Sequence, residues 1–230
     1  MSELKLPITM IDRLRMITDG SGVTTLICSS GCPLRCRFCI NPSSWDGTPP
    51  IESLTIDELY ERVKIDNLYF LSTNGGLCFG GGEPLLHSKF LKSFMNKYKE
   101  LGWNFYIESS LSVSKENIED ILPFVNSYII DTKDMNKERY EKYTNGNYDL
   151  FLENLLFLKE NVPVEKIKVR VPEIEFLHNG NKEQLENADK LKELGFTDIE
   201  LLKYIDPESR KKISETAKEN KNILSNGKTW

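Results

Sequence analysis

The sequence has no long apolar run and no concentration of positive charge. Glu3, Lys5, Asp12, Arg13 and Arg15 interrupt the first residues, so neither the hydrophobic segment of a signal peptide nor a membrane span is predicted. The formal net charge is −5 at pH 7, and no basic stripe with interleaved aromatic residues is present. The electrostatic pattern of a nucleic-acid-binding protein is therefore excluded. These absences predict a cytoplasmic protein that binds neither nucleic acid nor membranes.

Repeats and low-complexity segments are also absent, and short apolar runs alternate with longer amphipathic ones. A length of 230 residues suits one large domain. We expect this domain over 1–220, followed by a flexible tail over 221–230. The short runs are rich in β-branched or aromatic residues and predict strands at 23–28, 76–79, 104–107, 127–130, 166–171 and 198–202. Helices are predicted at about 55–70, 88–101, 114–122, 149–160, 182–194 and 207–220.

This alternation of strands and helices favours a parallel sheet with right-handed crossovers. Thr55 stands three residues before Glu58, which is a capping-box pattern, and Ser114 occupies the N-cap position of another predicted helix. Six βα units are too few for a closed eight-stranded barrel. The predicted fold class is therefore α/β, a partial and laterally open (β/α)6 barrel.

Cysteine is scarce and unevenly placed. There are five cysteines, an odd number, and four of them lie within the twelve residues from Cys28 to Cys39. Such clustering indicates metal or redox chemistry rather than a disulfide framework. Cys32, Cys36 and Cys39 form a C-x3-C-x2-C pattern in the loop after the first predicted strand. Three thiolates bind three irons of a [4Fe-4S] cubane and leave the fourth iron open to another ligand.

A structural zinc site is the alternative for these cysteines. Zinc needs four ligands, so it would have to recruit Cys28 or His87. Cys28 and Cys78 lie inside apolar strands, where buried and inert thiols are expected, and the chain has no second C-x2-C pair. His87 and His178 are expected to be structural.

Polar residues follow the other predicted strands, at the edge where β/α barrels build their sites. Three glycines after the second strand, Gly80 to Gly82, expose backbone groups to a ligand, and Glu83 comes next. The following strands end in Glu108-Ser109-Ser110, in Asp131-Thr132-Lys133, near Arg170, and near Lys203 and Tyr204. Both signs of charge are therefore expected around one site, as a zwitterionic amino acid requires, although any single residue could equally be a solvated strand end.

The cysteine pattern resembles the signature of the radical S-adenosylmethionine (SAM) superfamily, C-x3-C-x-aromatic-C, with Phe38 at the aromatic position. Gly81-Gly82-Glu83, about forty residues downstream, resembles the GGE motif of that superfamily. The resemblance implies that the three cysteines hold a [4Fe-4S] cluster, that the SAM adenine lies against Phe38 and that the GGE motif engages the SAM amino group. It implies an oxidoreductase that cleaves SAM reductively to methionine and a 5′-deoxyadenosyl radical.

From Asp19 to Tyr204 the chain resembles more closely the pyruvate formate-lyase activating enzymes and other activases of glycyl radical enzymes. The matching motifs are Asp19-Gly20-Ser21-Gly22, Asn41-x3-Trp45-Asp46, Gly80 to Leu86, Asp131-x-Lys133 and Ile199 to Tyr204. Ser21, Thr24 and Ile205 depart from the family pattern and indicate a divergent partner. With five cysteines, the chain lacks the cysteine-rich insert of relatives that carry extra ferredoxin-type clusters.

By this resemblance, Lys133 and Arg170 help to hold SAM, and Asp131 with Glu108 and Ser109 lines a monovalent-cation site beside it. The implied partners are a flavodoxin-like or ferredoxin-like electron donor and a glycyl radical enzyme whose backbone glycine gives up hydrogen. Two alternatives stay open. One is the same chemistry on a ribosomally made peptide or a small molecule, and the other is a non-enzymatic regulatory protein that binds a cluster or zinc.

Overall fold

The computed structural model describes residues 3–16, 18–45, 52–174, 177–178 and 181–204. The helix predicted at 207–220 and the tail predicted at 221–230 lie outside these residues, as do Asp46 and Ile205. None of the described helices is long and apolar enough to cross a membrane.

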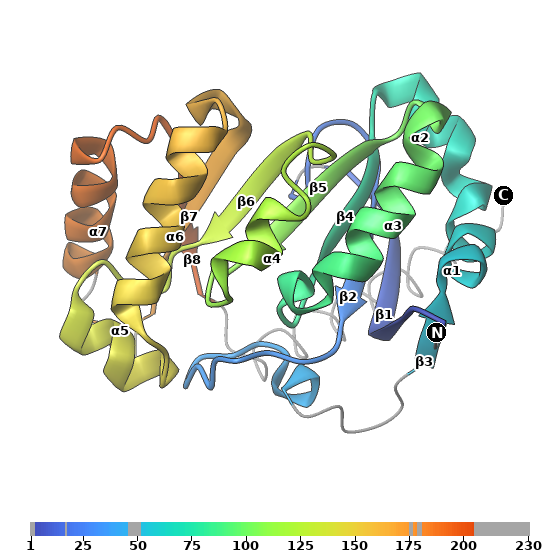
Figure 1. The fold of residues 1–230 in the computed structure, drawn as a ribbon. Coiled ribbons are helices and arrows are strands. Elements are labelled where there is room, and N and C mark those ends of the chain that lie inside the picture. Colours follow the sequence, from blue (N-terminus) through green and yellow to red (C-terminus); the bar gives the residue numbers. More distant parts are fainter. Residues whose placement is uncertain (1–2, 17, 46–51, 175–176, 179–180, 205–230) are drawn as a thin grey trace, which may run out of the picture.

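Six parallel strands form the centre of the molecule (Figure 1). In their order across the sheet they are β2 (Thr24–Ser29), β4 (Gly76–Gly81), β5 (Asn104–Ser109), β6 (Ser127–Asp131), β7 (Ile167–Glu173) and β8 (Asp198–Lys203). Each corresponds to one predicted strand. Within the described residues the sheet stays open, with β3 and β8 as its two outer strands. The predicted partial, laterally open (β/α)6 barrel is confirmed.

Two strands at one edge of the sheet lie outside the predicted pattern. β1 (Lys5–Arg15) runs antiparallel to β2, and β3 (Glu52–Thr55) runs antiparallel to β1. The register between β1 and β2 shifts twice, between Ile8 and Met10 and again between Asp12 and Arg15. Leu6 and Ile8 are buried on either side of the partly buried Pro7, but the register shifts interrupt this alternation along the rest of β1.

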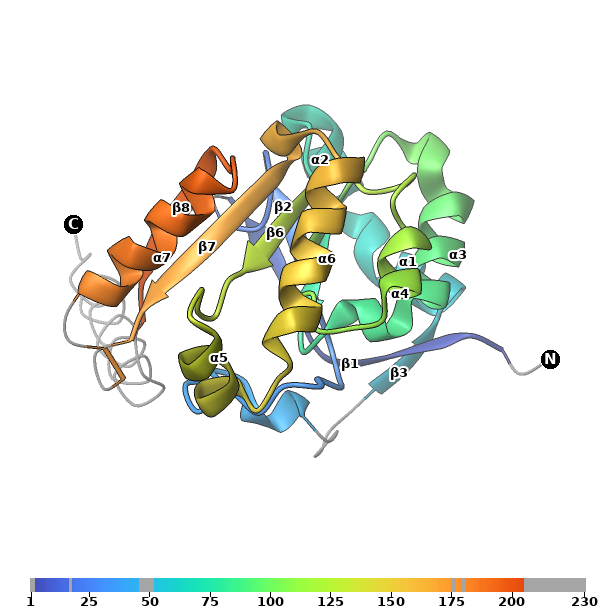
Figure 2. The same cartoon turned by 60° about the vertical axis from the view of Figure 1, so that its left-hand side comes forward.

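Helices cover the outer face of the parallel strands (Figures 1 and 2). They are α1 (Ile56–Val63), α2 (Asn67–Thr73), α3 (Ser88–Tyr98), α4 (Lys115–Glu119), α5 (Lys137–Thr144), α6 (Tyr148–Asn161) and α7 (Lys182–Glu193). The segment predicted as one helix over 55–70 is α1 and α2, separated by a 3-10 turn over Lys64–Asp66. The capping box of Thr55 and Glu58 is confirmed. α5 is absent from the sequence prediction because this short helix buries only Tyr140 and Thr144.

The two faces of the parallel strands bury different kinds of residue. The outer face packs Ile27, Phe79, Ile107 and other apolar side chains against the helices. The inner face carries a smaller apolar cluster of Leu26, Cys28, Cys78, Tyr106 and Ile129. Successive residues of a strand point to opposite faces, so every second residue lies on the inner face. On β5 to β8, inner-face residues closer to the carboxyl ends are charged. The inner face therefore changes from apolar to charged along the strands.

Asp66 joins β1 to the helical layer and is fully buried. Arg13 Nε donates to its Oδ2 at 2.9 Å, and Thr25 Oγ1 donates to the same oxygen at 2.8 Å. We expect Asp66→Asn to lower the free energy of unfolding by about 2 kcal/mol, because it removes the charged acceptor of hydrogen bonds at a fully buried position, although Arg13 itself is 41% exposed. Urea unfolding of the iron-free, reduced protein measures the effect.

The matched control for this prediction is Glu52→Gln. Glu52 also bonds an arginine, Arg62, at 2.9 Å, but both side chains are about half exposed. Exposed pairs contribute about 0–1 kcal/mol, so the control should stay close to the wild type. Equal losses in the two variants would contradict the role assigned to burial of Asp66.

Candidate functional site

One cavity of about 470 Å³ lies at the carboxyl ends of the parallel strands. Its lining includes the predicted residues Cys32, Cys36, Phe38, Cys39, Gly81, Gly82, Glu108, Ser109, Asp131, Lys133 and Arg170. These residues come from the loop after β2 and from the ends of β4, β5, β6 and β7. The structure therefore brings together every predicted site residue except Glu83, which does not line the cavity.

Backbone hydrogen bonds position both ends of the cysteine loop, the segment after β2 that carries Cys32, Cys36 and Cys39. Near β2, Gly82 N donates to Ser29 O at 2.9 Å and Glu83 N donates to Gly31 O at 2.7 Å. Farther along, Arg35 N and Arg37 N donate to carbonyl oxygens of the last turn of α5, at 2.7 and 2.9 Å. The end of α5 therefore positions the loop, and Figure 2 shows the two segments side by side. Sequence reasoning missed this contact because it missed α5.

The thiols of the loop fit a metal cluster as ligands. Burial raises the pKa of Cys36 to about 11, against the lowering effect of the Lys133 ammonium, and burial also raises the pKa of Cys32. Iron binding would displace the protons, as it does for any thiol ligand. The three side chains belong to one short loop and face one cavity, with Leu34, Phe38 and Ile174 packed around them. Three soft donors with a cavity on one side match a cubane with an open iron.

The zinc alternative finds no fourth ligand among the described residues. Cys28 packs in the inner apolar cluster with Cys78, and burial raises the pKa of Cys28 to about 12. The predicted burial of both thiols is thus confirmed. His87 Nε2 is hydrogen-bonded to Ser30 O at 2.8 Å. Across the described ranges, no three His, Cys, Asp or Glu side chains are arranged to hold a single metal ion.

Gly81 and Gly82, at the end of β4, are required because this strand lies very close to its neighbours. Gly81 has a φ of +89°, and a Cβ there would lie 2.6 Å from Cys28 Cα. A Cβ on Gly82 would lie 2.3 Å from Gly31 O. Side chains at these positions would push β4 away from the cysteine loop. The two glycines therefore bring the cavity wall next to the cysteines.

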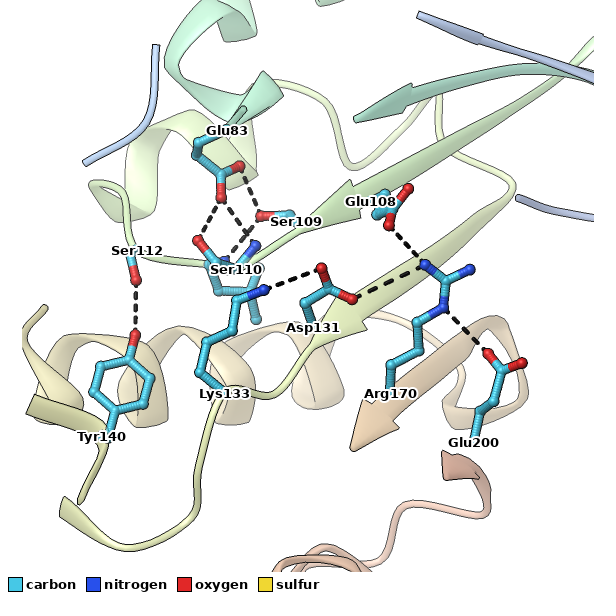
Figure 3. Close-up of polar contacts among 11 residues, drawn as sticks. Glu83, Glu108, Ser109, Ser110, Ser112, Asp131, Lys133, Tyr140, Arg170 and Glu200 are labelled. Carbon is cyan, nitrogen blue, oxygen red and sulfur yellow. Dashed lines mark hydrogen bonds and ion pairs between the residues drawn. The ribbon is translucent and has the colours of Figure 1, made fainter. Parts of the chain in front are cut away.

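Glu83 is fully buried, and its carboxylate faces the end of β5 (Figure 3). It accepts hydrogen bonds from Ser109 Oγ at 2.8 Å, from Ser110 N at 2.9 Å and from Ser110 Oγ at 2.6 Å. Burial raises the pKa of Glu83, and these donors oppose the rise. Glu83 is thus bonded to the end of β5. Its contact with a ligand stays a prediction.

A layer of charged side chains crosses the cavity wall from β5 to β8 (Figure 3). Arg170 Nη1 donates to Glu108 Oε1 at 2.6 Å, and Arg170 Nε donates to Glu200 Oε2 at 3.1 Å. Asp131 Oδ1 lies 3.9 Å from Arg170 Nη1, and Lys133 Nζ donates to Asp131 Oδ2 at 3.1 Å. Burial and then Asp131 raise the pKa of Glu108 to about 7, while Arg170 opposes the rise. Cationic and anionic groups therefore alternate along the wall.

Sequence reasoning missed two partners of Arg170 in this layer, Glu200 and Thr18. Glu200 lies on β8 opposite Arg170, and its inward position could have been found from its spacing of two from Leu202, which also lines the cavity. The carbonyl oxygen of Thr18, in the β1–β2 connection, accepts from Arg170 Nη2 across 152 positions of sequence. No pattern in the sequence signals that contact.

Phe38, the aromatic residue of the cysteine loop, contacts the end of β8. Phe38 is 7% exposed, and its ring meets that of Tyr204 edge to face, with centroids 6.3 Å apart. Both side chains line the cavity, as does Lys203. The edge-to-face contact holds Phe38 at the cavity boundary, where a flat ligand ring could lie against it.

The sequence model described as "Radical SAM superfamily" matches residues 26–174, which is more than half of the chain. The 4-hydroxyphenylacetate decarboxylase activating enzyme of Clostridioides difficile is 28% identical over 219 residues, covering 69% of this chain and 69% of that protein. The pyruvate formate-lyase-activating enzyme of Clostridium pasteurianum is 27% identical over 226 residues, covering 88% and 93%.

Solved structures with little sequence identity share the fold. QueE from Escherichia coli superposes with a TM-score of 0.53 at 16% identity, covering 95% of this chain and 92% of that one. SuiB of Streptococcus suis, bound to its precursor peptide SuiA, gives a TM-score of 0.61 at 13% identity. The match covers 78% of this chain and 38% of SuiB.

Proposed function

The chain belongs to the radical SAM superfamily, and from that premise we propose that it activates a partner glycyl radical enzyme by removing a hydrogen atom from a backbone glycine. Two observations support the proposal. The predicted ligand cysteines and the charged strand ends converge on one cavity. Relatives that align with most of the chain carry names of activating enzymes for a decarboxylase and for pyruvate formate-lyase.

Cys32, Cys36 and Cys39 would hold a [4Fe-4S] cluster, which would supply the electron, received from a flavodoxin-like or ferredoxin-like donor, for reductive cleavage of SAM to methionine and a 5′-deoxyadenosyl radical. The chain's own residues would bind and orient SAM. Lys133 offers an ammonium group to its carboxylate, and the backbone of Gly81 and Gly82 allows close approach. Phe38 offers a ring face to the adenine. The cavity walls would keep water from the reactive groups.

The sheet is not closed among the described strands, and the gap beside the cavity supports the proposal that the substrate is a polypeptide. The cavity is lined from one side by Met10 of β1 and from the other by Leu202 of β8, and these strands are not paired with each other. Met10 is 49% exposed. A loop of a partner protein could therefore enter between the two strands and bring a glycine to the cavity, where a hydrogen atom would move from its α-carbon to the 5′ carbon.

The test mixes the reduced enzyme, SAM and the glycyl radical enzyme encoded nearest to this chain's gene, under anaerobic conditions. We expect a glycine-centred EPR doublet that collapses when the α-carbon is deuterated, and cleavage of the partner at that glycine on exposure to oxygen. A partner with alanine at the target position is the control. Transfer of deuterium into 5′-deoxyadenosine from a labelled short peptide or metabolite, with no partner radical, would instead establish the peptide or small-molecule alternative.

A further inference from the structure

Arg170 occupies the space between the carboxylates that sequence resemblance assigns to a monovalent cation. Its side chain is 8% exposed. Its guanidinium donates to Glu108 at 2.6 Å and lies 3.9 Å from Asp131, so one cationic group is close to both carboxylates. Figure 3 shows the guanidinium between Asp131 and Glu108 on one side and Glu200 on the other.

The strand register accounts for this position. Arg170 is the direct neighbour of Asp131 on β6 and of Glu200 on β8. Glu108 stands farther back, since its own partner on β6 is Ile129. The glutamate side chain, one methylene longer than aspartate, spans the remaining distance. Gly80 provides room for it, because a Cβ at that position would lie 3.0 Å from Glu108 Oε2.

The donor set needed for a small cation is incomplete around these carboxylates. The third predicted ligand, Ser109, directs its hydroxyl to Glu83 at 2.8 Å and bonds Leu111 N at 2.9 Å. The second oxygen of Asp131 accepts from Lys133 Nζ at 3.1 Å. Monovalent cations require several oxygen ligands that converge on one point, and here the oxygens converge on nitrogen donors instead.

We propose that the Arg170 guanidinium, rather than a bound monovalent cation, balances the charges of Glu108 and Asp131 in this active site. The arrangement is stable without an added ion, because three of the five guanidinium N–H groups bond to Glu108, Glu200 and the Thr18 carbonyl oxygen. The inference deepens the proposed function, on which it rests: SAM binding and cleavage should be indifferent to the identity of the monovalent cation in the buffer.

Thallous ion, a spectroscopic substitute for potassium, tests the site on iron-free protein. We expect no saturable, potassium-displaceable broadening of the Tl⁺ resonance with the wild type. Arg170→Ala leaves three carboxylates facing one another and should gain such binding. Arg139→Ala is the matched control, since among the residues that the structure describes Arg139 pairs with one carboxylate, that of the buried Asp134. Circular dichroism checks that each variant is folded.

Saturable Tl⁺ binding by the wild type would overturn the proposal, and so would a folded Arg170→Ala variant that binds no Tl⁺. If that variant does not fold, Tl⁺ binding by the wild type alone tests the proposal. A second readout is the rate of 5′-deoxyadenosine formation when potassium is replaced by tetramethylammonium. We expect a change below about twofold, and a loss of more than about tenfold would contradict the inference. Absence of SAM cleavage in every salt would count against the proposed function instead, with the Tl⁺ result still deciding this point.

Discussion

Replacing Cys36 by alanine is expected to remove the cluster and abolish SAM cleavage. Cys36 is 7% exposed, lies between the other two cysteines of the loop and has apolar neighbours on its buried side. A cubane held by only two thiolates exposes two irons and loses its geometry. Anaerobically reconstituted wild type should be brown, with about four irons per chain, whereas Cys36→Ala should be colourless. Cys32→Ala and Cys39→Ala should behave alike.

The matched control is Cys28→Ala. Cys28 is separated from Cys32 by three residues and is buried, as Cys36 is, but its side chain packs in the inner apolar cluster beside Cys78. Iron content should therefore stay at the wild-type level, with a small loss of stability from the missing sulfur atom. Stoichiometric zinc in place of iron, or loss of metal from Cys28→Ala alone, would refute the assignment of the ligands.

Replacing Lys133 by glutamine is expected to weaken SAM binding about 10- to 100-fold while iron content is unchanged, since a hydrogen bond to a charged group contributes about 1.5–3 kcal/mol. Burial by itself lowers the pKa of Lys133, but Asp131 and the nearby thiols outweigh it and raise the pKa, so the ammonium is charged. The side chain is 19% exposed and faces the cavity. Equilibrium binding of SAM to the reconstituted protein measures the loss.

Lys137→Gln controls for the loss of one positive charge. Lys137 begins α5, four residues after Lys133, and its side chain is 52% exposed where it pairs with Asp149. Binding of SAM to this variant should match the wild type. If Lys133→Gln binds SAM as tightly as the wild type, or loses iron in parallel with SAM, Lys133 does not contact the carboxylate.

Local sequence was sufficient to identify the six parallel strands and the cysteine loop. Five of these strands, β2 and β4 to β7, are short and mostly buried, so each has an apolar signal that does not depend on its neighbours, whereas β8 is partly exposed. The cysteine spacing is a property of eight consecutive residues, and the carboxyl ends of parallel strands meet at one edge whatever the helices do. For these reasons almost all predicted site residues line one cavity.

β1, β3 and α5 could not be predicted in the same way. β1 pairs with both β2 and β3, and its register shifts against β2 interrupt the alternating pattern along most of the strand. α5 is a polar helix whose position depends on Tyr140 packing against Tyr148 and Phe151 and on its hydrogen bonds to the cysteine loop. Contacts distant in sequence, rather than local preference, stabilise all three.

The sequence by itself determined which residue types gather at the carboxyl edge of the sheet, because the positions of the six parallel strands and their side-chain parity follow from local patterns. Only the tertiary structure decided how those residues pair. Arg170 bonds Glu108, Glu200 and Thr18 O because neighbouring strands fix its level, and Ser109 bonds Glu83 because the loop after β4 passes over the end of β5. The physical reason is that the attraction between two charges is strong only over a few ångströms, so a charged side chain pairs with the opposite charge that the fold brings near it. No local sequence pattern specifies that distance.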